Sequence, residues 1–161
     1  RDLSNDTPMP AFETTRRVAF TPTQMFDLVA DVERYPEFLP LCEGLRVLSR
    51  EQAEGGDEVI VAAMDVGYKA VRETFTSRVR LDRAALRVSA DLVNGPFRHL
   101  ENRWSFVEAP GGCDVRFAIS YEFKSLMLQM LMGALFDQAF RKFTEAFEER
   151  ARRVYATTVS T

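Results

Sequence analysis

The stretch that decides the fold is residues 113–155, CDVRFAISYEFKSLMLQMLMGALFDQAFRKFTEAFEERARRVY. Its first part, up to Phe123, alternates apolar and polar side chains, as a strand with one buried face does. After Ser125, a candidate helix cap, apolar residues recur at helical spacing and no proline interrupts them. We therefore expect a strand that leads into one uninterrupted helix from Leu126 to about Tyr155.

The two halves of this helix differ in their apolar pattern. The second half carries one apolar stripe, with charged residues on the other faces. The stripe consists of Phe136, Ala139, Phe140, Phe143, Phe147, Ala151 and Val154. Residues 126–136 are apolar on nearly every face, so this half should be covered on all sides. Either it belongs to the core, or it borders a pocket whose flexible methionines adapt to an apolar ligand.

Upstream of this helix, alternation with a period of two extends over about eighty residues, which predicts a sheet. Clusters of turn-forming residues divide it into hairpins of an antiparallel meander. These clusters lie at residues 54–57, 82–83, 94–96 and 110–112. Together with the N-terminal part of the chain, this pattern predicts a curved antiparallel sheet of about seven strands.

The N-terminal part adds a strand over residues 12–20 and then a helix, because Thr21-Pro22 suits a helix cap and first turn. Residues 35–40, YPEFLP, break this helix into a second short helical turn or bend. The fold class is therefore α+β, with one sheet, two short helices and a long C-terminal helix. We expect one domain over residues 11–155, preceded by a disordered extension or expression scar (1–10) and followed by a flexible tail (156–161).

The composition limits the classes of function. The chain has 161 residues, a formal net charge of -3 and a sequence pI near 5.3, which argues against a protein that grips DNA. Its 13 phenylalanines against 4 tyrosines favour rings that fill apolar space. Cys42 and Cys113 are predicted to be reduced thiols in a cytosolic compartment. No apolar run has the length of a membrane span, so we expect a cytoplasmic protein, with peripheral attachment to the inner membrane as an alternative.

Three blocks of residues carry a resemblance to a known family. Residues 29–40, VADVERYPEFLP, resemble the signature of the coenzyme Q-binding START-like family, whose bacterial members are also described as ribosome-association toxins or oligoketide cyclases. Residues 66–69 with 72–79, and residues 94–100, are similar to it as well. The resemblance implies the helix-grip fold of START-like proteins, birch-pollen-allergen-like proteins and polyketide cyclases. It also implies a bound ubiquinone or other polyprenyl lipid, with no catalytic cofactor.

The sequence offers little for catalysis. His99 is the only histidine, and strand alternation places it on the face opposite Leu100 and Trp104. A histidine-based metal site, a Ser-His pair and a Cys-His pair inside a pocket are therefore not expected, and no glycine-rich phosphate loop is present in the sequence. We expect a protein that is not an enzyme.

Two polar residues are expected on the apolar face of the sheet. Glu73 shares a face with Phe75, where a carboxylate is costly unless it is paired or protonated. It would meet an arginine, lie near the mouth of a cavity or bind the polar head of a ligand. Asn102 would bond a quinone carbonyl or satisfy a bulged backbone.

A ligand cavity between the sheet and the C-terminal helix is expected to be lined by residues of both, with the segment at residues 35–40 as a lid and Phe38 and Leu41 as its apolar lip. The candidate ligand-binding residues are Phe26, Tyr35, Phe38, Leu41, Glu73, Phe75, Leu92, Phe97, Leu100, Asn102, Trp104, Phe117, Ile119, Phe123, Met127, Met130, Leu131 and Leu135.

Three functions remain open at this point. The first is a carrier or chaperone of a respiratory quinone, which contacts membranes transiently. The second is a ribosome-association toxin that binds the large ribosomal subunit, and the third is a polyketide cyclase or aromatase. Arg72, Arg78 and Arg80 alternate onto an outer face. That face is either simply solvated or contacts anionic lipid headgroups or ribosomal RNA.

Overall fold

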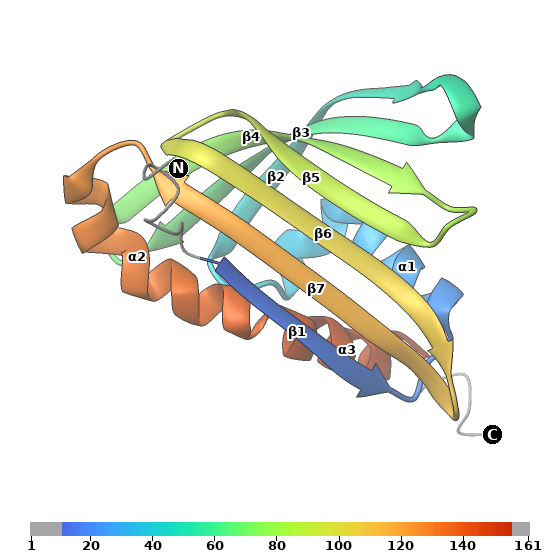
Figure 1. Cartoon of the computed structure of the whole chain (residues 1–161). Helices are drawn as coiled ribbons and strands as arrows, with labels where there is room; N and C mark the ends of the chain where they lie inside the picture. The colour runs from blue at the N-terminus through green and yellow to red at the C-terminus, as the bar shows by residue number, and fades with distance from the viewer. Residues whose placement is uncertain (1–10, 156–161) are drawn as a thin grey trace, which may run out of the picture.

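Seven antiparallel strands form one curved sheet in the computed structural model, which describes residues 11–155 (Figure 1). The strands are β1 (Ala11–Val18), β2 (Cys42–Gln52), β3 (Glu58–Tyr68), β4 (Val71–Asp82), β5 (Arg87–Asn94), β6 (Phe97–Ala109) and β7 (Gly112–Phe123). Their order across the sheet is β1-β7-β6-β5-β4-β3-β2. The predicted α+β class and the sheet of about seven strands are confirmed. The two terminal segments predicted above, 1–10 and 156–161, lie outside the described residues.

The longer helices pack on the inner side of this sheet (Figure 1), and one short 3-10 helix lies in the loop between β2 and β3. The helices are α1 (Pro22–Ala30), the 3-10 helices η2 (Val32–Glu37) and η3 (Glu54–Gly56), α2 (Leu126–Arg141) and α3 (Phe143–Tyr155). Thr21 caps α1 as predicted, because its side chain accepts a hydrogen bond from the amide of Gln24, and the Gln24 side chain accepts one from the amide of Thr21. Ser125 caps α2 by accepting from the amide of Leu128.

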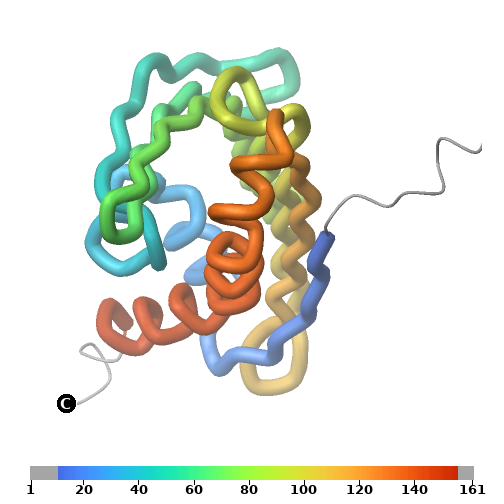
Figure 2. The backbone as a smooth tube through the Cα atoms, turned by 90° about the vertical axis from the view of Figure 1, so that its left-hand side faces the viewer, coloured from blue at the N-terminus to red at the C-terminus, as the bar shows by residue number. Residues whose placement is uncertain are grey.

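The expectation of one uninterrupted C-terminal helix is wrong, because α2 ends at Arg141 and a new helix begins at Phe143. Lys142 between them has φ -100° and ψ 0°, and Figure 2 shows α3 leaving in a different direction. Phe143 packs on Phe117 of β7, with ring centroids 6.0 Å apart, and Phe147 packs on Trp104 of β6 at 5.0 Å. The helix changes direction at Lys142 because these two contacts keep α3 against the curved sheet. The sequence has no glycine or proline at this position from which the break could be predicted.

The core lies between the inner face of the sheet and the two C-terminal helices. Aromatic rings connect them, as where Phe136 of α2 packs against Phe97 and Phe123 with centroid distances of 5.8 and 5.5 Å. Both cysteines are buried free thiols, and burial raises the pKa of each to about 11. Within residues 11–155, no helix combines the length and apolar character that crossing a bilayer requires.

Candidate ligand cavity

An apolar cavity of about 90 Å³ lies between the inner face of the sheet and the helices α2 and α3. Inward residues of β2 to β7 form its floor, and η2 with the segment that follows it forms one side. Leu41 in that segment has a positive φ of 67°, which turns the chain from η2 into β2 and leaves the side chain against the cavity. The prediction of a pocket between sheet and C-terminal helix therefore has a structural counterpart.

Seven of the predicted ligand-binding residues line this cavity. They come from η2, from the turn after it and from inward positions of the sheet. They are Tyr35, Leu41, Phe75, Leu100, Asn102, Trp104 and Ile119.

The cavity wall also contains residues that were not predicted as ligand-binding. They are Val32, Leu39, Pro40, Leu45, Ala62, Met64, Val66, Ser77, Val79, Val88, Ala90, Phe136, Ala139, Phe140, Phe143 and Phe147. Alternation could have found some of them, since Ser77 follows Phe75 by two residues on the same strand face. The helical phenylalanines were interpreted only as the stripe that packs on the sheet, and they do this while also facing the cavity.

The remaining predicted residues lie away from the cavity wall. They are Phe26, Phe38, Glu73, Leu92, Phe97, Phe117, Phe123, Met127, Met130, Leu131 and Leu135.

Most aromatic members of that group fill the core around the cavity. Phe117 lies behind Trp104, with ring centroids 4.7 Å apart, and Phe97 stacks on Phe123 at 4.8 Å. Phe26 is fully buried and packs edge-on against Phe106. Phe38 is half-buried beside η2 and contacts the ring of Phe147, which itself lines the cavity.

The expected cover on all sides of the first half of α2 is wrong. Leu128 and Met132 turn toward the protein, but Met127, Met130 and Leu131 are exposed to solvent. The reason is geometric, because α2 begins beyond the end of β7, where no sheet or helix formed by residues 11–155 lies over its outer face (Figure 1). Leu135 is half-buried, and Leu92 of β5 is half-buried as well.

Polar atoms are few in the cavity wall. Asn102 donates to the carbonyl of Ala118 and accepts from the indole N–H of Trp104, both at 2.9 Å. Asn102 was expected either to bond a quinone carbonyl or to satisfy a backbone group, and the structure shows it hydrogen-bonded to a backbone carbonyl of the neighbouring strand. The Tyr35 hydroxyl donates to the carbonyl of Val29, and burial raises the pKa of this phenol far above its ordinary value. The Ser77 hydroxyl makes no hydrogen bond to any described residue, so it remains available to a ligand.

Glu73 and His99 complete the set of polar candidates. Glu73 is half-buried and lies opposite Val66 of β3, on the same face of β4 as Phe75. It forms no ion pair among the described residues. The predicted pairing with an arginine is therefore absent there. His99 lies on the outer face as predicted, with its ring nitrogen 2.9 Å from the Ser120 hydroxyl.

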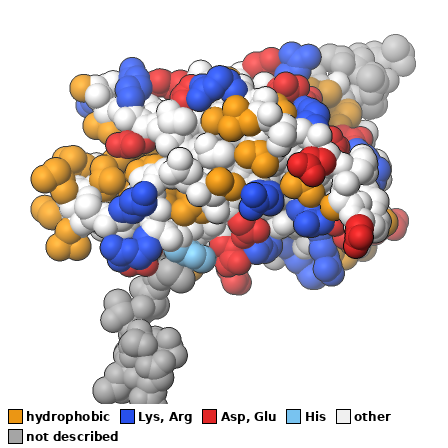
Figure 3. All heavy atoms as spheres, turned by 90° about the horizontal axis from the view of Figure 1, so that it is seen from above, with side chains coloured by type: hydrophobic (Ala, Val, Ile, Leu, Met, Phe, Trp, Pro, Cys, Tyr) orange, Lys and Arg blue, Asp and Glu red, His pale blue; other side chains and the backbone are white. Residues whose placement is uncertain are grey.

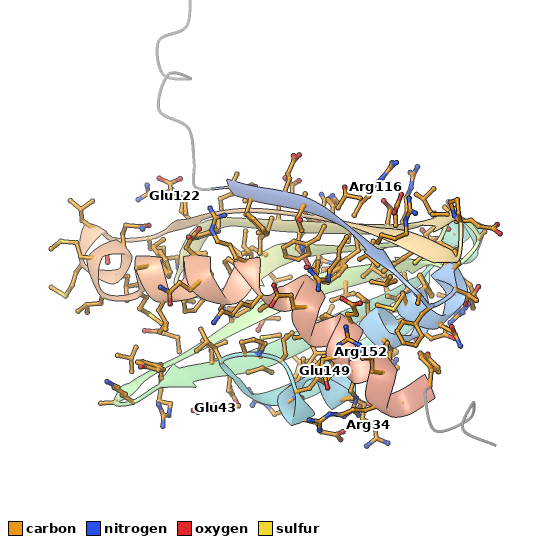
Figure 4. The ribbon with its side chains drawn as sticks, turned by 90° about the horizontal axis from the view of Figure 1, so that it is seen from below. Arg34, Glu43, Arg116, Glu122, Glu149 and Arg152 are labelled. Atoms are coloured by element: carbon orange, nitrogen blue, oxygen red, sulfur yellow. The ribbon has the colours of Figure 1, made fainter. Side chains whose placement is uncertain are left out.

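The outer face of the sheet carries the predicted arginines together with acids. Arg72 and Arg80 are exposed and form salt bridges with Glu43 and Asp57, whereas exposed Arg78 forms none within residues 11–155. Arg116 lies on the side of the sheet that faces away from the C-terminal helices (Figure 4). The interspersed acids make this a mixed surface rather than a uniformly basic one.

Comparisons with known proteins agree with this fold. The family described as "Polyketide cyclase / dehydrase and lipid transport" matches residues 18–148. The ribosome association toxin RatA of Vibrio cholerae is 37% identical over 139 residues, covering 86% of this chain and 92% of the toxin. The mitochondrial coenzyme Q-binding protein COQ10 homolog B of Xenopus laevis is 33% identical over 149 residues, covering 89% of this chain and 59% of that protein.

Two solved structures share the architecture. The 18 kDa protein CC1736 from Caulobacter crescentus has a TM-score of 0.75 and 34% identity, covering 92% of this chain and 99% of that one. The Zhui aromatase/cyclase from a Streptomyces species has a TM-score of 0.77 with 20% identity, covering 93% and 98% of the two chains. At 20% identity the second likeness concerns the fold alone.

Proposed function

Because the chain belongs to the polyketide cyclase / dehydrase and lipid transport family, we propose that it binds a prenylated quinone such as ubiquinone between its sheet and α2–α3 and carries it unchanged. The observation that carries this proposal is the chemistry of the cavity wall, which is apolar apart from Tyr35, Ser77, Asn102 and Trp104. Such a wall suits an isoprenoid, since each buried methylene contributes about 0.8 kcal/mol. The name of the Xenopus relative supports the quinone as the ligand class.

The size of the cavity adds a requirement to this proposal. At about 90 Å³ it is smaller than an engineered cavity of about 150 Å³ that holds benzene. A quinone ring with its tail therefore needs the cavity to expand. Lys142 separates α2 from α3, and we propose that loading proceeds by displacement of α2 about this break.

The polar groups of the wall support binding rather than catalysis. None of the described residues lining the cavity is a His, Cys, Asp, Glu, Lys or Arg, so the wall offers no acid–base pair. The Tyr35 phenol is held by the Val29 carbonyl. The free Ser77 hydroxyl is the candidate partner for a quinone carbonyl, because one hydrogen bond to it orients the ring without changing it.

The test is native mass spectrometry with organic extraction of the protein purified from cells that make ubiquinone. We expect close to one quinone per chain, and strong loss of it in Ser77→Leu, which blocks the wall beside the expected head group. The matched control is Ser89→Leu, on the outer face of β5. A wild-type protein that carries no quinone and takes up none from micelles would refute the proposal.

A second candidate function is association with the large ribosomal subunit. The name of the Vibrio relative, a ribosome association toxin, favours contact with the ribosome. The exposed outer-face cations Arg78, Arg87 and Arg116, which form no salt bridge in the described chain, favour it as well. Cosedimentation with purified subunits tests it, with Arg78→Glu combined with Arg116→Glu as the variant. We expect this variant to weaken any subunit binding and to spare ligand retention. Equal cosedimentation of variant and wild type would exclude this face as the contact.

A further inference from the structure

The first turns of α2 expose a cluster of large apolar side chains to solvent. The exposed fractions are 79% for Leu126, 69% for Met127, 81% for Met130 and 64% for Leu131. We call these four residues the α2 tip. Hydrophobic side chains gather at this end of the molecule in Figure 3, and sulfur atoms project from the start of α2 in Figure 4. A contiguous apolar group on a surface commonly marks an interaction site.

Two strand turns share this end of the molecule with the α2 tip (Figure 2). The amide of Lys124 donates to the carbonyl of Pro96 at 2.8 Å, which fixes the β5–β6 turn beside the start of α2. Val93, just before that turn, is 45% exposed, and Tyr68 at the β3–β4 turn is 46% exposed. Apolar or amphipathic side chains from three separate segments therefore reach the surface at one end of the fold.

Two lysines without a salt bridge accompany the α2 tip. Residues 125–136 contain no charged side chain. Lys124, at the base of α2, and Lys69, at the β3–β4 turn, form no salt bridge within the described residues.

The other charges at this end are largely neutralised. Arg98 pairs with Glu122 and Arg72 pairs with Glu43, whereas Glu73, half-buried on the inner face, forms no ion pair among the described residues. The α2 tip is thus an uncharged apolar surface accompanied by two lysines that form no salt bridge, and the Lys69 ammonium lies over the Tyr68 ring, 5.2 Å from its centroid.

We propose that the α2 tip is the docking surface for a phospholipid bilayer that contains anionic lipids. Its apolar side chains would enter the boundary between headgroups and acyl chains, and Lys69 and Lys124 would contact lipid phosphates. The docking proposal rests on the proposed function in one respect only, which is that delivery of an apolar ligand gives the protein a reason to contact a bilayer.

A second copy of the chain fits the α2 tip less well than a bilayer does. A second copy would present the same two lysines, and its residues 125–136 contain no acid to pair with them. A bilayer instead presents negative charge to these same lysines. Docking would also hold the part of α2 next to Met132 and Phe136, which pack toward the sheet beside the cavity.

The experiment is flotation of the delipidated full chain with quinone-free vesicles, either of equal phosphatidylglycerol and phosphatidylcholine or of phosphatidylcholine alone. We expect binding to the anionic vesicles and weaker binding to the neutral ones. Met130→Gln combined with Leu131→Gln should lower the partition coefficient at least about tenfold, equivalent to about 1.4 kcal/mol. The matched control combines Leu48→Gln with Val107→Gln, which are exposed apolar residues outside the tip.

Each other outcome overturns the docking proposal. If the wild type fails to bind anionic vesicles, or if the tip variant and the control bind equally, the tip does not contact bilayers. Concentration-dependent dimerisation that the tip variant abolishes, without vesicle binding, would assign the surface to a second copy. Because neither protein nor vesicle contains quinone, a failure here is independent of whether the cavity binds quinone. Far-ultraviolet circular dichroism and urea unfolding verify that all variants are folded.

Discussion

Replacing Ala62 with isoleucine is expected to stabilise the empty protein and to exclude the ligand. Ala62 lies in β3 directly opposite Ser77, and both residues line the cavity. Isoleucine suits a strand and adds three carbon atoms at this wall. These carbons would occupy the void that the ligand has to use.

The magnitude follows from the cavity volume. A void of about 90 Å³ at about 24 cal/mol per Å³ corresponds to about 2 kcal/mol. Three buried carbons at about 0.8 kcal/mol each give a similar figure. Imperfect fit in a packed core costs about 1 kcal/mol or more, so we expect the free energy of unfolding to rise by about 1 kcal/mol.

The assay is urea unfolding of delipidated protein, paired with quinone extraction from protein purified from cells. The midpoint should rise at an unchanged slope, while the quinone content falls severalfold. Ala118→Ile is the matched control, since it adds the same carbons to a central strand on the outer face and should leave quinone content unaltered. Unchanged quinone in Ala62→Ile, or a loss of stability greater than about 1 kcal/mol, would refute the assignment of this void to the ligand.

Three further predictions address the surroundings of the cavity. Asn102→Ala leaves the indole N–H of Trp104 without its partner and removes one donor to the Ala118 carbonyl, so urea unfolding should show a loss of about 2 kcal/mol. Ser125→Ala removes the cap of α2 and should cost about 1 kcal/mol, with faster amide hydrogen exchange in the first turn of that helix. In the folded chain the thiols of Cys42 and Cys113 each have a pKa of about 11, whereas the pKa of a thiol in the unfolded chain is near 9. Stability should therefore fall between pH 9 and 11, and Cys113→Ala should flatten this decline, whereas an unchanged pH dependence would contradict it.

The regular parts of the fold were predictable because their signals are local. Strand residues with one buried face must alternate, and Thr21 and Ser125 show their caps in the sequence. The helix break at Lys142 has no such signal. It follows from the contacts of Phe143 and Phe147 with a curved sheet, and these contacts exist only in the folded protein.

The cavity was predictable in position but only partly in its residues. Strict alternation would place Phe97 and Leu100 on opposite faces, but an irregularity between Phe97 and His99 leaves both buried, and of the two only Leu100 borders the void while Phe97 packs among other rings. That difference depends on the distance between sheet and helix, which no sequence period encodes. Met130 was predicted to be covered but is exposed. An apolar pattern on all faces of a helix does not show whether the outer face is covered by the protein itself or by something outside it.

The position of Trp104 gives the protein a built-in optical probe. It is the only tryptophan in the chain, it is 4% exposed, and it lies in the cavity wall with its indole N–H bonded to Asn102. Its ultraviolet emission therefore originates beside the space assigned to the ligand. A quinone ring held there would quench that emission, so loading and release become observable in real time on the unlabelled native chain.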